Sequence, residues 1–392
     1  MAHPTILRRT RTYTMLSAPR QPLPPTSVPG VIHSHGATDE WAYRYVSHGV
    51  MAKQYQLADD LISKVVIDSI QSGIARESAS LLATVYFQRK RYGGTVRALG
   101  DVSIQSKLAQ SLNVISLFLF DGGYGQWEEW LDLAVRQSQQ ILKAGRFMSL
   151  KDALINCDGS EQFIVKTTIW FDVLASVTRM RPPSLFEAVK ELFDPNQSSV
   201  LEVSNEGNAP ALSMMTVMGC EGRIIWALAQ ISALAQAKEA YAARGAVDTM
   251  WLVNKCKDIE ALLHPPAANS LKNEEVHRVL TSEVFRNAAR LYLYTIVHGD
   301  FPNVQPIRKA VDDTFAALQA ARKQYSSSVG QIVVRSTVFA VFMLGYDEGI
   351  VYGNFKGVTE VMESVWNERE KSEAKDPVPW RKALFNAGLL LV

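Results

Sequence analysis

Two pairs of adjacent aspartates come closest to a catalytic motif in this sequence. Asp59-Asp60 and Asp312-Asp313 could hold magnesium ions against a diphosphate, as in terpene synthases, if further carboxylates followed one helical turn away. Ile67 occupies the place of the closing carboxylate after the first pair, and none completes the second. Short motifs often match by chance, so we interpret each pair as part of a solvated helix face or a helix start and expect no enzyme.

Nucleophilic and metal chemistry have equally little support. The three cysteines, Cys157, Cys220 and Cys256, are too few and too widely spaced for a disulfide scaffold or a four-ligand zinc site. His33 and His35 lie in a proline-rich segment without neighbouring ligands. The chain has neither a GxSxG nor a GxxxxGK[ST] motif. We therefore expect buried structural thiols, with no cofactor and no metal site.

The charge of the chain is nearly balanced. Among 392 residues, 41 Lys and Arg face 39 Asp and Glu, a net charge of +2 that supplies no general attraction to nucleic acid or membranes. The densest basic run, Arg89-Lys90-Arg91, fits a helix end or surface role. The most apolar stretch, residues 329–346, is interrupted by polar residues and is shorter than the ~20 residues of a membrane span. We predict no membrane contact.

The apolar residues indicate helices from Trp41 onward, because they recur every three or four positions. In one such stripe Phe285, Ala289, Tyr292 and Ile296 follow each other, and residues 298–303 form a turn before the next helix. Strand patterns are nearly absent. We predict an all-α fold, an irregular α-α bundle of about a dozen helices in one large domain.

The composition predicts a tail and one helical domain. Residues 1–41 combine scattered arginines with many prolines, so we expect a disordered basic tail, followed by a helical domain over 42–392. Within that domain residues 211–244 are predicted to form one long, central helix. Its methionines Met214, Met215 and Met218 fit the core better than a binding pocket.

Several segments, in order along residues 42–392, resemble blocks of the fungal-specific transcription factor domain, which follows a binuclear zinc cluster in many fungal regulators. The chain has counterparts of four blocks of that domain: a TxxWxDVLAS block followed by R-R-P-P, a GC corner before a long apolar helix, a yR-AA-LYLy helix, and a closing vW, dWr and LL pattern. The matching residues are Trp170, Asp172, Arg179, Arg181, Pro182, Gly219, Cys220, Arg286, Ala289, Tyr292, Trp366 and Trp380.

These signature residues also have a physical interpretation. The aromatic members, Trp170, Tyr292, Trp366 and Trp380, can serve as large apolar anchors between helices. Asp172 can pair with Arg179 or Arg181 near a helix end. The signature is therefore expected to describe packing, without catalytic, cofactor-binding or metal-binding residues.

The resemblance implies a regulator of transcription by RNA polymerase II, located in the nucleus and responsive to a small-molecule effector or a coregulator, with homodimers or heterodimers as options. Residues 1–50 contain no cysteine, whereas the family's zinc cluster needs six. Direct DNA binding is thus unsupported: the module was lost, the chain is truncated, or it acts through partners. The alternative is a helical scaffold without a transcriptional role, which would fit the cytoplasm.

Overall fold

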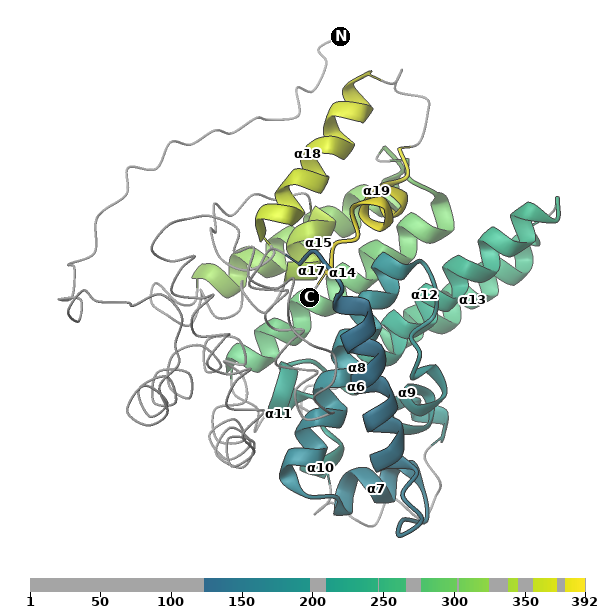
Figure 1. Ribbon diagram of the computed structural model, residues 1–392. Coiled ribbons are helices and arrows are strands. Elements are labelled where there is room, and N and C mark those ends of the chain that lie inside the picture. Colours follow the sequence, from purple (N-terminus) through teal and green to yellow (C-terminus); the bar gives the residue numbers. More distant parts are fainter. Residues whose placement is uncertain are drawn as a thin grey trace, which may run out of the picture.

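The computed structural model describes residues 123–197, 209–245, 247–265, 276–301, 303–323, 338–344, 355–371 and 378–391. Within these ranges every regular element is a helix and no strand is present (Figure 1). The predicted all-α fold of about a dozen helices is confirmed. The tail 1–41, Asp59-Asp60 and the two histidines lie outside the described residues, and the domain boundaries stay predictions.

The helices follow one another along the chain and are named as in Figure 1. They are α6 (Trp127–Leu142), α7 (Leu150–Asn156), α8 (Gly159–Arg179), α9 (Phe186–Phe193), the 3-10 helix η4 (Pro195–Gln197), α10 (Ala209–Leu212), α11 (Met215–Met218), α12 (Gly222–Ala243), α13 (Thr249–Leu262), α14 (Val276–His298), α15 (Gln305–Lys323), α17 (Val338–Leu344), α18 (Phe355–Lys371) and α19 (Trp380–Ala387).

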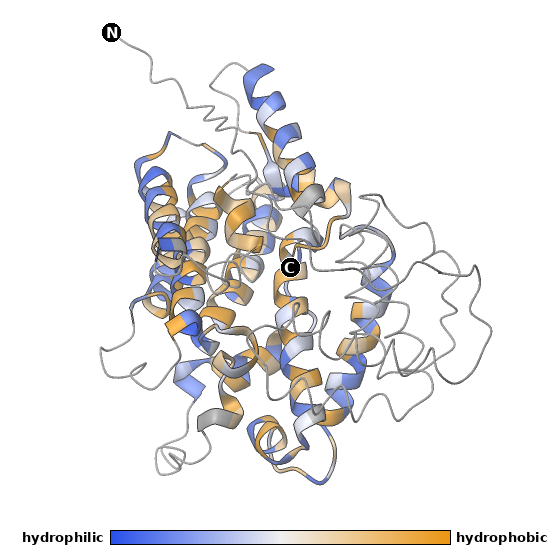
Figure 2. Ribbon diagram, turned by 90° about the vertical axis from the view of Figure 1, so that its left-hand side faces the viewer, coloured by the Kyte–Doolittle hydropathy of each residue, from blue (hydrophilic) through white to orange (hydrophobic). Residues whose placement is uncertain are grey.

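Three long helices, α8, α12 and α14, form the centre of the core. Residues 165–179 of α8 are buried on every side, and α12 is buried through residues 224–229. A helix that is apolar around its whole circumference must be covered on all faces. The other helices supply that cover: α6 packs on α8, α9 and α13 on α12, and α15 and α17 on α14. Figure 2 shows the hydrophobic residues concentrated inside and the largely hydrophilic α18 projecting at the top.

The last described residues belong to this core. Leu389, Leu390 and Leu391 are fully buried. The Thr178 hydroxyl donates to the carbonyl of Leu389 at 2.7 Å, and the N–H of Leu390 donates to the carbonyl of Gly123 at 2.8 Å. The segment after α19 therefore joins the end of α8 to the segment before α6, and the C-terminal end lies among the helices (Figure 1).

The turn predicted at residues 298–303 is confirmed. Helix α14 ends at His298, Gly299 adopts a positive φ of 80°, and α15 begins at Gln305. Helix α15 then returns along α14. The stripe of Phe285, Ala289 and Tyr292 lies on the buried side of α14 as predicted.

The single helix predicted over residues 211–244 is wrong. The chain forms α10, α11 and α12 instead, and the break before α12 lies at Gly219. There φ is 59° and ψ is 28°, and the Gly219 N–H closes the last turn of α11 on the carbonyl of Met215 at 3.1 Å. A left-handed residue ends an α-helix and redirects the chain. Apolar periodicity continued through this position, so it did not reveal the break.

Among the described residues, no helix is long and apolar enough to cross a bilayer. The apolar stretch 329–346 contributes α17, which has only seven residues. Its residues 338–342 are buried in the protein core.

Replacing Gly219 by alanine tests the role of this corner. An L-residue in the left-handed region costs about 1–2 kcal/mol, so Gly219→Ala should lower the free energy of unfolding by about that amount. Gly145→Ala is the matched control, because Gly145 has no positive φ and its new methyl group would meet no atom within 4 Å. Urea unfolding of both variants measures the effect. Equal stability of the two would contradict this role of the corner.

Candidate functional site

Three aromatic signature residues come together in the core. Trp170 of α8 meets Phe285 of α14 edge to face, with ring centroids 4.7 Å apart. Tyr292, two turns further along α14, contacts Phe339 of α17 at 6.0 Å and Trp380 of α19 at 5.8 Å, both in T-shaped geometry. Edge-to-face pairs stabilise beyond the area they bury. These rings therefore join α8, α14, α17 and α19, as packing anchors would.

Tyr292 also connects a line of polar groups through the centre. The hydroxyls of Ser176 on α8 and Ser232 on α12 lie 2.8 Å apart, and the Ser232 hydroxyl lies 3.4 Å from that of Tyr292. The guanidinium of Arg381 stands over the Tyr292 ring at 5.9 Å and donates to Glu239 of α12 at 3.1 Å. Buried hydroxyls that satisfy one another fix the relative position of the helices that carry them.

The Gly219-Cys220 corner faces Arg286 of α14. The Arg286 side chain is only 2% exposed, and its guanidinium donates to the carboxylate of Glu221, the residue that precedes α12. The Ser282 hydroxyl donates to the same carboxylate at 3.2 Å and accepts the N–H of Glu221 at 3.2 Å. Ala289, one turn after Arg286, is fully buried. Sequence analysis named Arg286 but missed its partner Glu221, which is 65 residues away.

The electrostatics of this corner follow from burial. Burial lowers the pKa of Arg286, and the charge of Glu221 opposes that shift. Burial, with Glu221 nearby, raises the pKa of Cys220 well above its usual range. Burial likewise raises the pKa of Cys157 and of Cys256 to about 11. All three thiols are therefore protonated at neutral pH and are poor nucleophiles.

The predicted ion pair of Asp172 with Arg179 or Arg181 is wrong. Asp172 is 1% exposed, and its carboxylate accepts the N–H of Leu185 at 2.8 Å. It thereby ties the loop through Pro182, which follows α8, back onto the helix. Burial raises the pKa of Asp172, opposed mainly by the loop N–H groups. The side chain of Arg181 is exposed.

Arg179 binds α6 instead. Its guanidinium lies 3.0 Å from Asp132 and 3.2 Å from Glu128, and stands over the Trp127 ring at 5.3 Å. The Trp127 indole in turn donates to the carbonyl of Gly388 at 2.9 Å. Helical neighbours were the predicted partners, but the packing of α6 on α8 brings closer carboxylates.

Trp366 is not the buried anchor that was predicted. Its side chain is 38% exposed on α18, and it forms part of the wall of a partly open cavity of about 160 Å³. Five helices and the α14–α15 turn contribute to this cavity. Its lining residues are Leu291, Asp300, Phe301, Ile307, Val311, Phe342, Met343, Leu344, Met362, Val365, Trp366, Arg369 and Trp380. None of the three methionines of the 211–244 segment is among them, and all three are buried.

Two charged groups lie in this apolar cavity. Burial raises the pKa of Asp300 from 3.8 to about 6, while the cations Arg369, Arg381 and Lys238 and a hydrogen bond from the Trp380 indole oppose the rise. Burial lowers the pKa of Arg369, and Asp300 opposes that shift. Sequence analysis missed both residues, since Asp300 lies in a predicted turn, where aspartate is common. Desolvated groups of opposite charge in a largely apolar cavity are typical of a ligand site.

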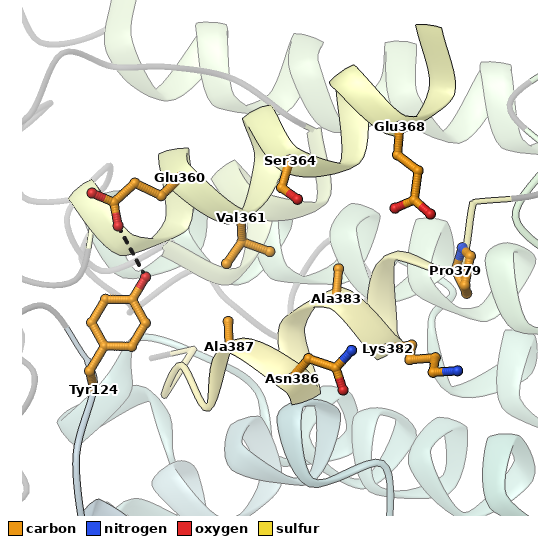
Figure 3. Close-up of a pocket in the computed structure, with 10 residues that line it drawn as sticks. All are labelled: Tyr124, Glu360, Val361, Ser364, Glu368, Pro379, Lys382, Ala383, Asn386 and Ala387. Carbon is orange, nitrogen blue, oxygen red and sulfur yellow. Dashed lines mark hydrogen bonds between the residues drawn. The ribbon is translucent and has the colours of Figure 1, made fainter. Parts of the chain in front are cut away.

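A second hollow lies between α18 and α19 (Figure 3). It has a volume of about 490 Å³, and polar residues such as Glu360, Glu368 and Lys382 form much of its wall. Glu360 points toward Tyr124, whose hydroxyl donates to it at 3.3 Å. Burial and this carboxylate raise the pKa of Tyr124 to about 12. This hollow is more open than the Asp300 cavity, and we regard the latter as the candidate site.

No metal chemistry is visible in the described ranges. No group of three His, Cys, Asp or Glu side chains there could hold a metal ion. Of the aspartate pair on α15, Asp312 is exposed and Asp313 lies 3.5 Å from Lys309. This pair is the solvated helix face that was predicted.

Removing the charge of Glu221 should destabilise the corner. The variant Glu221→Gln leaves buried Arg286 with Glu283 as its remaining carboxylate partner, so the loss should be that of one charged hydrogen bond, about 2 kcal/mol. The exposed pair Lys309–Asp313 provides the control: Asp313→Asn should change stability by less than about 0.5 kcal/mol. Urea unfolding compares the two, and similar losses would argue against this role of Glu221.

The raised pKa of Asp300 predicts a pH dependence of stability. The folded chain holds this proton up to about pH 6 and the unfolded chain only to about pH 4, so the contribution of Asp300 falls as pH rises between these values. Between about pH 5 and pH 7 the wild type should lose about 1 kcal/mol relative to Asp300→Asn. Urea unfolding at several pH values measures this difference. Parallel curves for the two proteins would refute the shift.

Comparison with known proteins extends the resemblance noted in the sequence. The family model of the fungal specific transcription factor domain matches residues 94–392. The chain is 24% identical over 164 residues to the ustiloxin B cluster transcription factor ustR of Aspergillus flavus, covering 38% of this chain and 26% of that protein. It is 23% identical over 248 residues to transcription factor ntnD of Nectria sp, covering 56% of this chain and 39% of that protein.

The matches thus span well under half the length of either relative. No solved structure matches the chain. The family match includes all twelve signature residues, and it extends over most of the chain. The chain therefore belongs to the fungal specific transcription factor domain family.

Proposed function

We propose that this chain is the regulatory part of a transcription regulator that acts in the nucleus, on genes transcribed by RNA polymerase II. The observation that carries the proposal is the family match over residues 94–392. Two similar proteins, both named as transcription factors, support it. The activity is regulatory and needs no catalytic step.

The geometry supports a domain that responds to an effector or a coregulator. The Asp300 cavity lies where α14, α15, α17, α18 and α19 meet. Trp380 lines this cavity and also contacts Tyr292 at the centre of the core. A molecule in the cavity would therefore contact a side chain that reaches the central helices, and this contact supports a coupling between the cavity and the core.

The proposal assigns no DNA contact to the described helices. A net charge of +2 gives the chain no general affinity for phosphates. Contact with DNA would come through a partner or through a module outside this sequence, and dimerisation with a second copy or a related chain is one such route. The competing proposal is a cytoplasmic helical scaffold, similar to the regulators in fold alone.

A fungal strain that expresses the tagged full-length chain from its own locus distinguishes the two proposals. We expect nuclear accumulation in at least one growth condition, and a defined set of transcripts that changes when the gene is deleted. Glu221→Gln should reproduce the deletion, because it disrupts the core, whereas Asp313→Asn should behave as wild type. Exclusion from the nucleus in every condition, together with unchanged transcripts, would favour the scaffold.

A further inference from the structure

We propose that the Asp300 cavity binds a small aromatic carboxylic acid, with its ring among the apolar walls and its carboxylate at Arg369. This inference names the class of effector and so rests on the proposed regulatory function. It follows from the size, the walls and the charges of the cavity.

The size of the cavity limits the ligand to about one ring. Its volume is about 160 Å³, and an engineered protein cavity of about 150 Å³ accommodates benzene. A polycyclic ligand would extend out of this partly open cavity toward solvent. A single ring with one short polar substituent fits the observed space.

The walls favour an aromatic ring over an aliphatic chain. Phe301, Phe342, Trp366 and Trp380 all line the cavity, and they come from the α14–α15 turn, α17, α18 and α19. Aromatic groups prefer one another in edge-to-face or offset geometry, which rings on several sides can provide. Trp366 is 38% exposed although it is large and apolar, and a ligand ring against it would cover that surface.

The charges around the cavity favour an anion over a cation. Asp300 is the acidic group of the lining, and three cationic side chains act on it: Arg369 in the lining, Arg381 and Lys238. Arg381 is 6% exposed and donates to Glu239, whereas its Nε and one of its terminal nitrogens have no hydrogen-bond partner among the described residues. Glu239 offsets one of these cations, so the named groups carry three positive charges against two carboxylates, and the one remaining positive charge favours an anion over an amine.

Arg369 is placed to receive the carboxylate. It lies in the cavity lining on α18, in the same lining as Trp366. Guanidinium groups bind carboxylates through two parallel hydrogen bonds. The carboxyl group of Asp300 tolerates a second carboxylate nearby, because burial has already raised its pKa to about 6 and it can take up a proton.

Three ligands of equal size and different charge test the class directly on the purified full-length chain. The probes are benzoate, neutral benzamide and cationic benzylamine, and calorimetry at about pH 6.5 measures their binding. We expect benzoate to bind with a dissociation constant of about 1 mM or tighter and at least about tenfold more tightly than benzylamine, with benzamide between them. Absence of benzoate binding at this level, or equal affinity for the three, would overturn the proposal.

Two variants locate the binding. Arg369→Gln should weaken benzoate about tenfold and change benzamide less than about threefold, because only the charged hydrogen bonds are lost. Val311→Phe fills the cavity from α15, leaves Arg369 in place, and should abolish binding of both probes. Lys309→Ala, on the exposed side of the same helix, should bind as the wild type does. Unchanged benzoate affinity in Val311→Phe would place any binding elsewhere and refute the site.

The binding assay has no transcriptional readout, so the two proposals fail separately. If the chain binds benzoate in the cavity but gene deletion leaves all transcripts unchanged, the binding site is supported and the proposed regulatory function is refuted. If gene deletion changes transcripts but the chain binds none of the probes, the regulatory function is supported and this class of effector is refuted.

Discussion

Burial of Tyr292 is the constraint on which the rest of the structure depends. A tyrosine in the interior needs apolar contacts for its ring and a hydrogen-bond partner for its hydroxyl. Ser232 on α12 lies within reach of the hydroxyl, and Phe339 and Trp380 pack against the ring. Each contact comes from a different helix. The positions of α12, α17 and α19 around α14 are therefore linked through one side chain.

The buried charges reinforce this arrangement at the ends of the helices. Arg286 binds Glu221 at the corner before α12, Asp172 accepts a hydrogen bond from the loop after α8, and Arg179 binds Asp132 on α6. A buried charge without a partner destabilises the fold, so each of these groups favours the one arrangement of the helices that brings its partner within reach. In this chain most of the signature residues thus make packing or capping contacts. Two differ: the Arg181 side chain is exposed, and Trp366 lines the Asp300 cavity with part of its surface exposed.

Trp380 connects the Asp300 cavity to the central helices. Trp380 contacts Tyr292 on one side and lines the cavity on the other. Its indole also donates to Asp300, the desolvated carboxyl of that cavity. A change at Asp300 or Arg369 would therefore alter the surroundings of Trp380, which packs against Tyr292 of α14. Well-packed interiors transmit small displacements because they contain little free space.

The sequence by itself determined the helical class, the buried stripe of α14, the turn after His298 and the family. The first three depend on the spacing of residues within one segment, which periodicity reports directly. The family followed from the order of several short blocks along the chain. The aromatic residues Trp170, Tyr292, Trp366 and Trp380 were predicted to be anchors, and the three of them that pack in the core are Trp170, Tyr292 and Trp380.

Only the tertiary structure decided which groups meet. In the folded chain Arg286 binds Glu221, Asp172 accepts a hydrogen bond from the N–H of Leu185, and Arg179 binds carboxylates of α6. The predicted long helix is interrupted at Gly219, and Trp366 lies in the wall of a cavity. Asp300 and Arg369 are 69 positions apart, and neither carries a local pattern. The shift in the pKa of Asp300 arises from desolvation. Desolvation depends on the segments that cover a residue, and residue spacing along the chain does not contain that information.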